Sequence, residues 1–232
     1  MSGSAAAWAV RRSAIESRHA ALGARWIGDD VRWPAAYDPQ TGGPGTPVRL
    51  AEIGPFEEWL LRGPGALEAT NALLADDATA EVGRVAADAA DASGADVEAW
   101  VLGPDEVLLL APVGAASLAA TAGSLASGEV SVIEMTGART TVRIVGTAAP
   151  ALLAELCPAD TRPASFPEGG LIQAPVVAVR AFITRRDAGG EPGYTLMVAR
   201  DEAAYVWDSI LHIGEPHGLA VVGPDGVTEG AS

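Results

Sequence analysis

The sequence predicts an α+β protein built from two ferredoxin-like halves, at about residues 14–128 and 129–222. In each half, patterns typical of strands and helices follow one another in the order strand, helix, strand, strand, helix. This order differs from the regular βα alternation that indicates a parallel sheet. The length of 232 residues and the 49% hydrophobic composition allow one large core or two small ones.

Hydrophobic periodicity and turn residues place the elements of the first half. Apolar residues spaced by three or four positions predict helices, and apolar runs bounded by Gly and Pro predict strands. The turn Gly103-Pro104-Asp105 between two apolar runs is typical of a hairpin. The expected elements up to residue 135 are a helix at 14–26, an irregular loop at 33–47, a strand pair at 48–62 interrupted at Gly54-Pro55, a helix at 66–74, a weaker helix at 78–92, hairpin strands at 98–102 and 106–111, a helix at 115–125 and a strand at 130–135.

The same signals continue through the second half. Residues 1–13 are expected to form a flexible N-terminus, and the aperiodic residues 223–232 a disordered tail. The expected elements from residue 140 onwards are a strand at 140–145, a helix at 148–156, a loop at 157–170, strands within 171–184 and at 194–199, and a helix at 201–213.

The composition excludes several classes of function. The formal net charge is −15, and all 15 basic residues are Arg. Without Lys there is no lysine Schiff base and no Walker phosphate-binding loop, and the acidic balance argues against nucleic acid as a partner. Cys157 is the single cysteine, so no intrachain disulfide forms, and a buried, inert thiol is expected. The spacing of the three His residues indicates no metal site.

The sequence also predicts a soluble, cytoplasmic protein. The apolar runs end well before the roughly 20 residues that a membrane-spanning helix needs. The first ten residues carry no basic region ahead of an apolar stretch, so they do not form a secretion signal. We therefore expect no membrane partner.

Segments in the N-terminal part of the chain resemble one protein family. Ser17–Trp26 looks like the opening of glycine-cleavage T-proteins, where a short helix ends in a Leu-Gly-Ala step before a tryptophan-containing loop. Trp33–Tyr37 is similar to the continuation of that loop. Leu50–Gly54, followed by Leu61–Ala66, is similar to the first strand pair of the family and its Arg-Gly-Pro turn into a helix.

Later segments resemble both this family and a related one. Leu102–Leu109, Cys157–Phe166 and Ala203–Trp207 look like segments of sarcosine oxidase gamma subunits. Gly190–Val198, together with Gly214–Leu219, resembles the T-protein segment that closes its folate-binding region. Each motif is weak alone, and the specificity of the resemblance comes from their order and spacing.

The resemblance covers most of residues 17–222 and is to the tetrahydrofolate-binding superfamily of the T-protein (aminomethyltransferase) and the sarcosine oxidase gamma subunit. It implies the T-protein folate-binding fold without the C-terminal barrel domain into which a complete T-protein continues. It further implies tetrahydrofolate as cofactor, no metal, and transfer of an aminomethyl-type or methyl-type carbon in one-carbon metabolism. The alternative is a non-catalytic gamma-type subunit. Its partner would be a larger flavin-containing amine oxidase subunit, and a homo-oligomer is the other expectation.

The resemblance points to two acidic site residues. Asp96 lies where the catalytic aspartate of the family would lie, next to Val97 in place of a second acidic residue; a solvated loop aspartate is the alternative. Glu191 matches the first acid of the Gly-Glu-x-Gly turn, where it would orient the pterin or remain an exposed turn residue. The second acid of the family pattern is Thr195 here, and the upstream tyrosine aligns near Ala188.

Three further residues complete the expected cofactor site. Arg139 would grip the glutamate tail of folate through paired hydrogen bonds, or would pair with a structural acid such as Glu134. Tyr37 and Tyr194 supply ring faces that would stack on a pterin. The alternative for such aromatic residues is a place in the core.

Overall fold

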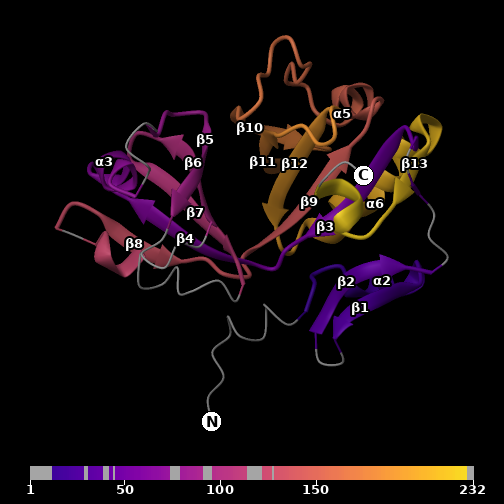
Figure 1. Ribbon diagram of the computed structural model, residues 1–232, viewed down its shortest axis with the longest axis horizontal. Coiled ribbons are helices and arrows are strands. Elements are labelled where there is room, and N and C mark those ends of the chain that lie inside the picture. The colour runs from indigo at the N-terminus through magenta and orange to yellow at the C-terminus, as the bar shows by residue number, and fades with distance from the viewer. Residues whose placement is uncertain are drawn as a thin grey trace. The chain divides into compact units, whose positions relative to one another are not determined.

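Two α+β units make up the part of the chain that the computed structural model describes, residues 12–28, 31–38, 42–43, 45–73, 79–90, 96–113, 122–126 and 128–228 (Figure 1). The six-stranded unit comprises Met1–Gly54, Arg139–Glu168 and Gln173–Ser232. The five-stranded unit comprises Pro55–Ala138 and Gly169–Ile172. Each unit combines one of the two larger sheets with helices, so the predicted α+β class is confirmed.

The larger sheet of the six-stranded unit has the strand order β10-β11-β12-β9-β3-β13. Strand β9 runs antiparallel to both β12 and β3, and β13 joins the edge parallel to β3. Nearly every residue of β3, β9 and β12 is buried, which indicates that both faces of the sheet are covered. The strands are β3 (Val48–Ile53), β9 (Arg139–Val145), β10 (Leu171–Val176), β11 (Val179–Arg185), β12 (Gly193–Ala199) and β13 (Leu219–Val221).

Helices and a two-stranded ribbon complete this unit. Helix α6 (Ala203–Gly214) buries Ala203, Val206, Trp207 and Ile210, which follow the spacing of one helix face. Helix α5 (Ala149–Leu156) has a proline in its first turn, where the missing N–H costs nothing, and it packs against α6. Both helices were predicted. The remaining elements are α2 (Glu16–Ala21), β1 (Ala24–Gly28), β2 (Val31–Tyr37), the 3-10 helix η1 (Glu215–His217) and α7 (Asp225–Thr228).

The five-stranded sheet has the order β5-β6-β7-β4-β8. Strands β6 and β7 form the predicted antiparallel hairpin around Gly103-Pro104-Asp105. Helix α3 packs on β7, and Leu61, Val101 and Leu109 belong to the core of this unit. The elements are β4 (Phe56–Arg62), α3 (Ala66–Asn71), β5 (Val85–Ala90), β6 (Asp96–Gly103), β7 (Glu106–Pro112) and β8 (Ser131–Glu134).

The predicted pairing of the two strands around Gly54-Pro55 is wrong. Strand β3 pairs with β9 and β13, whereas β4 pairs with β7 and β8, so the two strands enter different sheets. Gly54 has a φ of 125°, which a residue with a side chain rarely adopts, and it redirects the chain between the sheets. As a result, the two units are interleaved in sequence and do not follow the expected division near residues 128 and 129.

The weaker helix expected at 78–92 is also wrong. Residues Val85–Ala90 form strand β5, which pairs antiparallel with β6. The alanines of this segment have a high helix propensity, but pairing with an existing strand outweighs a local preference of this size. The helix expected at 115–125 lies largely outside the described residues. Within this range the structure describes residues 122–125, and 122–124 are helical.

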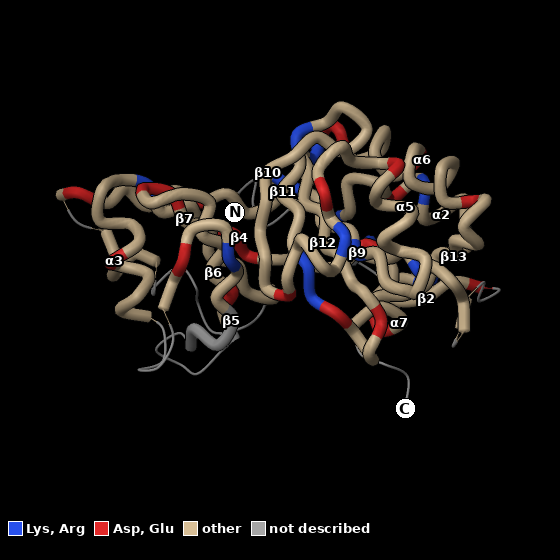
Figure 2. Tube along the Cα trace, turned by 90° about the horizontal axis from the view of Figure 1, so that it is seen from above, with Lys and Arg blue, Asp and Glu red and all other residues tan. Residues whose placement is uncertain are grey.

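Three expectations for irregular segments need correction. The loop predicted at 33–47 contains most of β2, because Pro34 is tolerated opposite Trp26 in a two-stranded ribbon with an irregular register. The tail predicted at 223–232 contains α7, which buries Val227 and is visible in Figure 2; residues 229–232 lie outside the described part. At the N-terminus, Ser13 is buried and residues 1–11 are not described.

Candidate functional site

One face of the six-stranded sheet carries arginines from neighbouring strands. Side chains alternate between the two faces along a strand, and directly opposed residues share a face. Strand pairing sets Arg49 of β3 opposite Val145 of β9, and Ala51 opposite Arg143. Arg139 lies four positions before Arg143 on β9 and therefore on the same side. We call this side the arginine face and define it by Arg49, Arg139 and Arg143.

An ion pair joins Arg49 to Glu191 on the arginine face. Glu191 ends the tight turn between β11 and β12, which two backbone hydrogen bonds of 3.0 Å to Ala188 close. Gly189 and Gly190 supply the positive φ angles that such a turn requires. Arg49 Nη2 donates to Glu191 Oε2 at 2.5 Å, while Arg49 Nε is buried without a hydrogen-bond partner among the described residues. The pair therefore keeps one unused donor.

Arg143 is held by three hydrogen bonds in the middle of the same face. Its Nε donates to the carbonyl of Val227 at 2.7 Å, its Nη1 to Thr195 Oγ1 at 3.1 Å, and its Nη2 to the carbonyl of Arg186 at 2.9 Å. A Cβ at Gly193 would lie only 2.2 Å from the Arg186 carbonyl oxygen, so glycine permits this close approach of the strands. Thr195 stands at the position of the second acid of the family pattern, and its hydroxyl accepts a hydrogen bond from Arg143.

Arg139 stacks on an aromatic ring at the start of β9. Its guanidinium carbon lies 5.5 Å from the centre of the Phe182 ring, a distance typical of a cation–π contact. Phe182 opposes Met197, which in turn opposes Thr141, so the ring also lies on the arginine face. Two of the predicted site residues, Arg139 and Glu191, are therefore on one side of one sheet.

The opposite face carries a buried group of side chains that we call the histidine cluster, made of His19, Tyr37, Glu52 and Trp207. Glu52 follows Ala51 on β3 and so points away from the arginine face. The His19 ring lies 2.7 Å from Glu52 Oε2 through Nε2 and 2.6 Å from the Tyr37 hydroxyl through Nδ1. The rings of Trp207 and His19 pack in a T-shaped arrangement, with 4.9 Å between ring centres. Helices α2 and α6 are thereby tied to β3.

The histidine cluster fixes the direction of its hydrogen bonds. With a carboxylate of Glu52 as acceptor and the Nε2–H tautomer of His19, Nε2–H donates to Glu52, and Nδ1 accepts from the Tyr37 hydroxyl. Burial, and secondly the charge of Glu52, raises the pKa of Tyr37. The phenol consequently stays protonated, and its O–H donates a hydrogen bond to His19 Nδ1.

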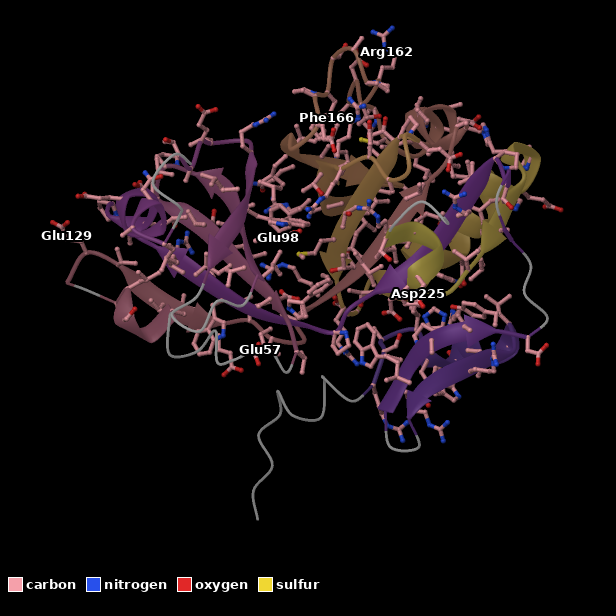
Figure 3. All side chains as sticks on the ribbon, viewed as in Figure 1. Glu57, Glu98, Glu129, Arg162, Phe166 and Asp225 are labelled. Carbon is pink, nitrogen blue, oxygen red and sulfur yellow. The ribbon has the colours of Figure 1, made fainter. Side chains whose placement is uncertain are left out.

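The other predicted site residues lie away from the arginine face. Tyr194 is fully buried on the side of Glu52, and its hydroxyl donates to the carbonyl of Thr161 at 2.9 Å, in the loop that carries Arg162 and Phe166 in Figure 3. Burial raises the pKa of Tyr194. Tyr37 belongs to the histidine cluster.

Asp96, the predicted catalytic residue, lies in the five-stranded unit. It is the first residue of β6, and its backbone pairs with Ala90 of β5. Its side chain is outside the described part of the chain. The expected loop aspartate is therefore a strand residue.

Sequence reasoning missed Arg49, His19 and Glu52. A signal existed for two of them, because Arg49 and Glu52 are charged residues inside an otherwise apolar strand, and buried charges need partners. His19 gave no comparable signal. Its role depends on contacts with residues 18 and 33 positions away, which only the fold brings together.

A small cavity opens in the six-stranded unit beside the histidine cluster. Its volume is about 340 Å³, and most of its wall is apolar. Tyr37 is the only member of the histidine cluster among its described lining residues. The lining residues are Leu22, Tyr37, Leu211, Glu215, Leu219, Ala220 and Val221.

Other kinds of site receive no support from the described residues. Among them, no group of three or more His, Cys, Asp or Glu side chains could hold a metal ion. None of their helices combines the length and apolar character needed to cross a bilayer. Cys157 is buried and free, as predicted.

Comparison with known sequences places the chain among relatives of two kinds. The family model of the GCVT N-terminal domain matches residues 45–228. An aminomethyltransferase from Frankia alni is 29% identical over 237 residues, which cover 92% of this chain and 61% of the relative. A sarcosine oxidase subunit gamma from Corynebacterium sp. (strain P-1) is 38% identical over 65 residues, covering 28% of this chain and 32% of the relative. The chain thus spans less than two thirds of the length of either relative.

Solved structures share the fold. A chain of the heterotetrameric sarcosine oxidase from Corynebacterium sp. U-96 has a TM-score of 0.67 and 24% identity, covering 90% of this chain and 97% of that chain. The glycine cleavage system aminomethyltransferase T from Bartonella henselae has a TM-score of 0.72 and 21% identity, covering 92% and 60%. Because the family model matches most of the sequence, the chain belongs to the GCVT N-terminal domain family, and the predicted relationship to T-proteins and sarcosine oxidase gamma subunits is confirmed.

Proposed function

We propose that the chain binds tetrahydrofolate on the arginine face. The observation that carries the proposal is the Arg49–Glu191 pair, in which a buried guanidinium donor has no partner among the described residues. An uncompensated buried donor costs free energy, and a ligand oxygen would remove that cost. The membership of the GCVT N-terminal domain family supports folate as the ligand class.

The chemistry of a pterin suits this pair. The pterin edge carries two kinds of N–H donor, at N3 and the 2-amino group, and a carbonyl oxygen at C4. Glu191, whose side chain is 25% exposed, would accept from the N–H donors, and Arg49 Nε–H would donate to the carbonyl oxygen. Arg139 would bind a carboxylate of the glutamate tail. Tyr37 and Tyr194, predicted to stack on a pterin, have no part in this proposal, because both are buried on the side of the sheet opposite the arginine face.

Ligand-dependent stabilisation tests the proposal. Saturating tetrahydrofolate, at about 100 times its dissociation constant, should stabilise the chain by about 2.7 kcal/mol, and Glu191→Gln should remove most of that gain. Glu202→Gln is the matched control, since Glu202 is exposed next to α6. Equal stabilisation of the Glu191 and Glu202 variants, or none of the wild type at saturation, would contradict the proposal.

A catalytic form of the proposal assigns a role to Asp96. If an aminomethyl-type carbon is transferred to the bound folate, positive charge develops during C–N cleavage, and the Asp96 carboxylate would stabilise it. Asp96→Asn should then leave folate-dependent stabilisation unchanged and lower the rate of transfer. Loss of both together would show that Asp96 supports binding and not chemistry.

A second candidate function is that of a non-catalytic gamma-type subunit. It is favoured by the structural similarity to a chain of a heterotetrameric sarcosine oxidase, because the match extends over 97% of that sarcosine oxidase chain. The partner would be a flavin-containing amine oxidase subunit. Purification from native cells should then give a complex with flavin absorbance and a mass above that of the monomer or homo-oligomer. A flavin-free monomer that tetrahydrofolate stabilises would decide for the first candidate.

A further inference from the structure

The cavity beside the histidine cluster is bounded by four segments of the six-stranded unit. Leu22 follows α2, Tyr37 ends β2, Leu211 lies on α6 and Leu219 begins β13. The volume of about 340 Å³ is at the lower end of the range for small-molecule sites. The cavity therefore suits a ligand of a few heavy atoms, which is smaller than a folate. None of the residues proposed to contact folate lines it.

The two polar side chains among the described lining residues, Glu215 and Tyr37, both present acceptor oxygens to the cavity. Glu215, at the start of η1, carries the negative charge, and no described residue makes a hydrogen bond or ion pair with its carboxylate. The hydroxyl proton of Tyr37 is directed to His19 Nδ1, so its oxygen offers lone pairs only. The Tyr37 ring adds an aromatic surface that attracts cations. Acceptors within an apolar wall select a ligand that is a donor, carries positive charge and has an apolar body.

We propose that this cavity binds a small organic cation of the alkylammonium class. The charge lies near Glu215 and the ring of Tyr37, and the alkyl body packs against Leu22, Leu211 and Leu219. Charge complementarity distinguishes the ligand from a neutral apolar molecule of the same size. The proposal is independent of folate binding, because the two sites share no residue.

Binding of n-butylammonium, 1-butanol and butyrate to the full chain tests the ligand class. Isothermal titration at fixed ionic strength should give n-butylammonium about tenfold tighter binding than 1-butanol, since a charge-assisted contact is worth about one factor of ten. Butyrate should bind most weakly. Equal affinities for the alcohol and the ammonium ion, or no binding of n-butylammonium, would overturn the proposal.

Variants locate the binding and separate it from the general attraction of an acidic protein for cations. Glu215→Gln should remove the preference for n-butylammonium over 1-butanol, whereas Glu202→Gln, an equal change of charge outside the cavity, should keep it. Leu219→Trp should fill the cavity and abolish binding of both probes. Glu191→Gln should bind n-butylammonium like the wild type whether or not it binds folate. An unchanged preference in Glu215→Gln would refute the assignment.

Discussion

Replacing Tyr37 by Phe removes a single oxygen from the histidine cluster and keeps the ring. The hydroxyl lies 2.6 Å from Nδ1 of His19, whose side chain is fully buried, so the substitution leaves a buried acceptor without its donor. Leaving a buried acceptor without a donor costs about 1–3 kcal/mol. For a chain of this length, that loss lowers the melting temperature by roughly 2–4 °C per kcal/mol. We therefore expect Tyr37→Phe to melt roughly 2–12 °C below the wild type.

Urea unfolding measures the same free energy directly. Tryptophan fluorescence should respond to the cluster, because Trp207 packs against His19 in a T-shaped arrangement. Fluorescence and circular dichroism must give one common transition before a single free energy is assigned, since the two units provide an opportunity for separate unfolding. Tyr205→Phe, on the exposed side of α6, is the matched control and should change stability by less than about 0.5 kcal/mol.

The outcome decides whether the histidine cluster stabilises the fold. A loss above about 1 kcal/mol for Tyr37→Phe, with an unchanged control, fits a buried and fully used hydroxyl. If Tyr37→Phe is as stable as Tyr205→Phe, the Tyr37 hydroxyl is not bonded to a buried imidazole, and the direction of hydrogen bonding derived for the cluster fails.

Three other predictions concern the backbone and pH. Ala178→Gly should stabilise the chain by about 1 kcal/mol in urea unfolding, because Ala178 has a φ of 70°; a loss of stability would contradict this reading. Burial raises the pKa of Glu57, which is labelled in Figure 3. The folded state therefore favours the protonated carboxyl, and the stability that this protonation contributes at low pH is lost as the pH rises through the folded-state pKa. Glu57→Gln should accordingly be more stable than the wild type at pH 7 and indistinguishable at pH 3, and the opposite trend would reverse the sign of the shift. Gly193→Ala should cost about 1–3 kcal/mol through the close Arg186 carbonyl, whereas Gly103→Ala, which has open space, should be nearly neutral; equal losses would show that crowding is not the cause.

Much of the fold follows from local patterns in the sequence. The turn Gly103-Pro104-Asp105 and the apolar runs around it are enough to predict the β6–β7 hairpin, because turn chemistry and register are both local. The spacing of Val206, Trp207 and Ile210 predicts α6 for the same reason. The departure of β4 from β3 was not predictable in this way, because partners in a sheet are chosen by the whole fold.

The candidate site shows the same limit more sharply. Glu191 was predicted from a motif, yet its partner Arg49 lies 142 positions away in sequence. Likewise, Arg139 and Glu191 lie on one face of the sheet and Tyr194 on the other. This assignment requires the register of the strands, which the sequence alone does not reveal. Residue types thus indicated the kind of chemistry, while the assembly of strands decided which of them share a face.

Because the two units are interleaved, the sheet of the six-stranded unit can be completed only late in synthesis. The five-stranded unit is almost continuous in sequence, whereas β3 leaves the ribosome long before β9 and β13, its neighbours in the sheet. Until then a nascent β3 presents unpaired backbone groups, a template for unwanted pairing with other chains. Because charged residues within an apolar strand oppose such pairing, we expect Arg49 and Glu52 to protect β3 before they meet their partners.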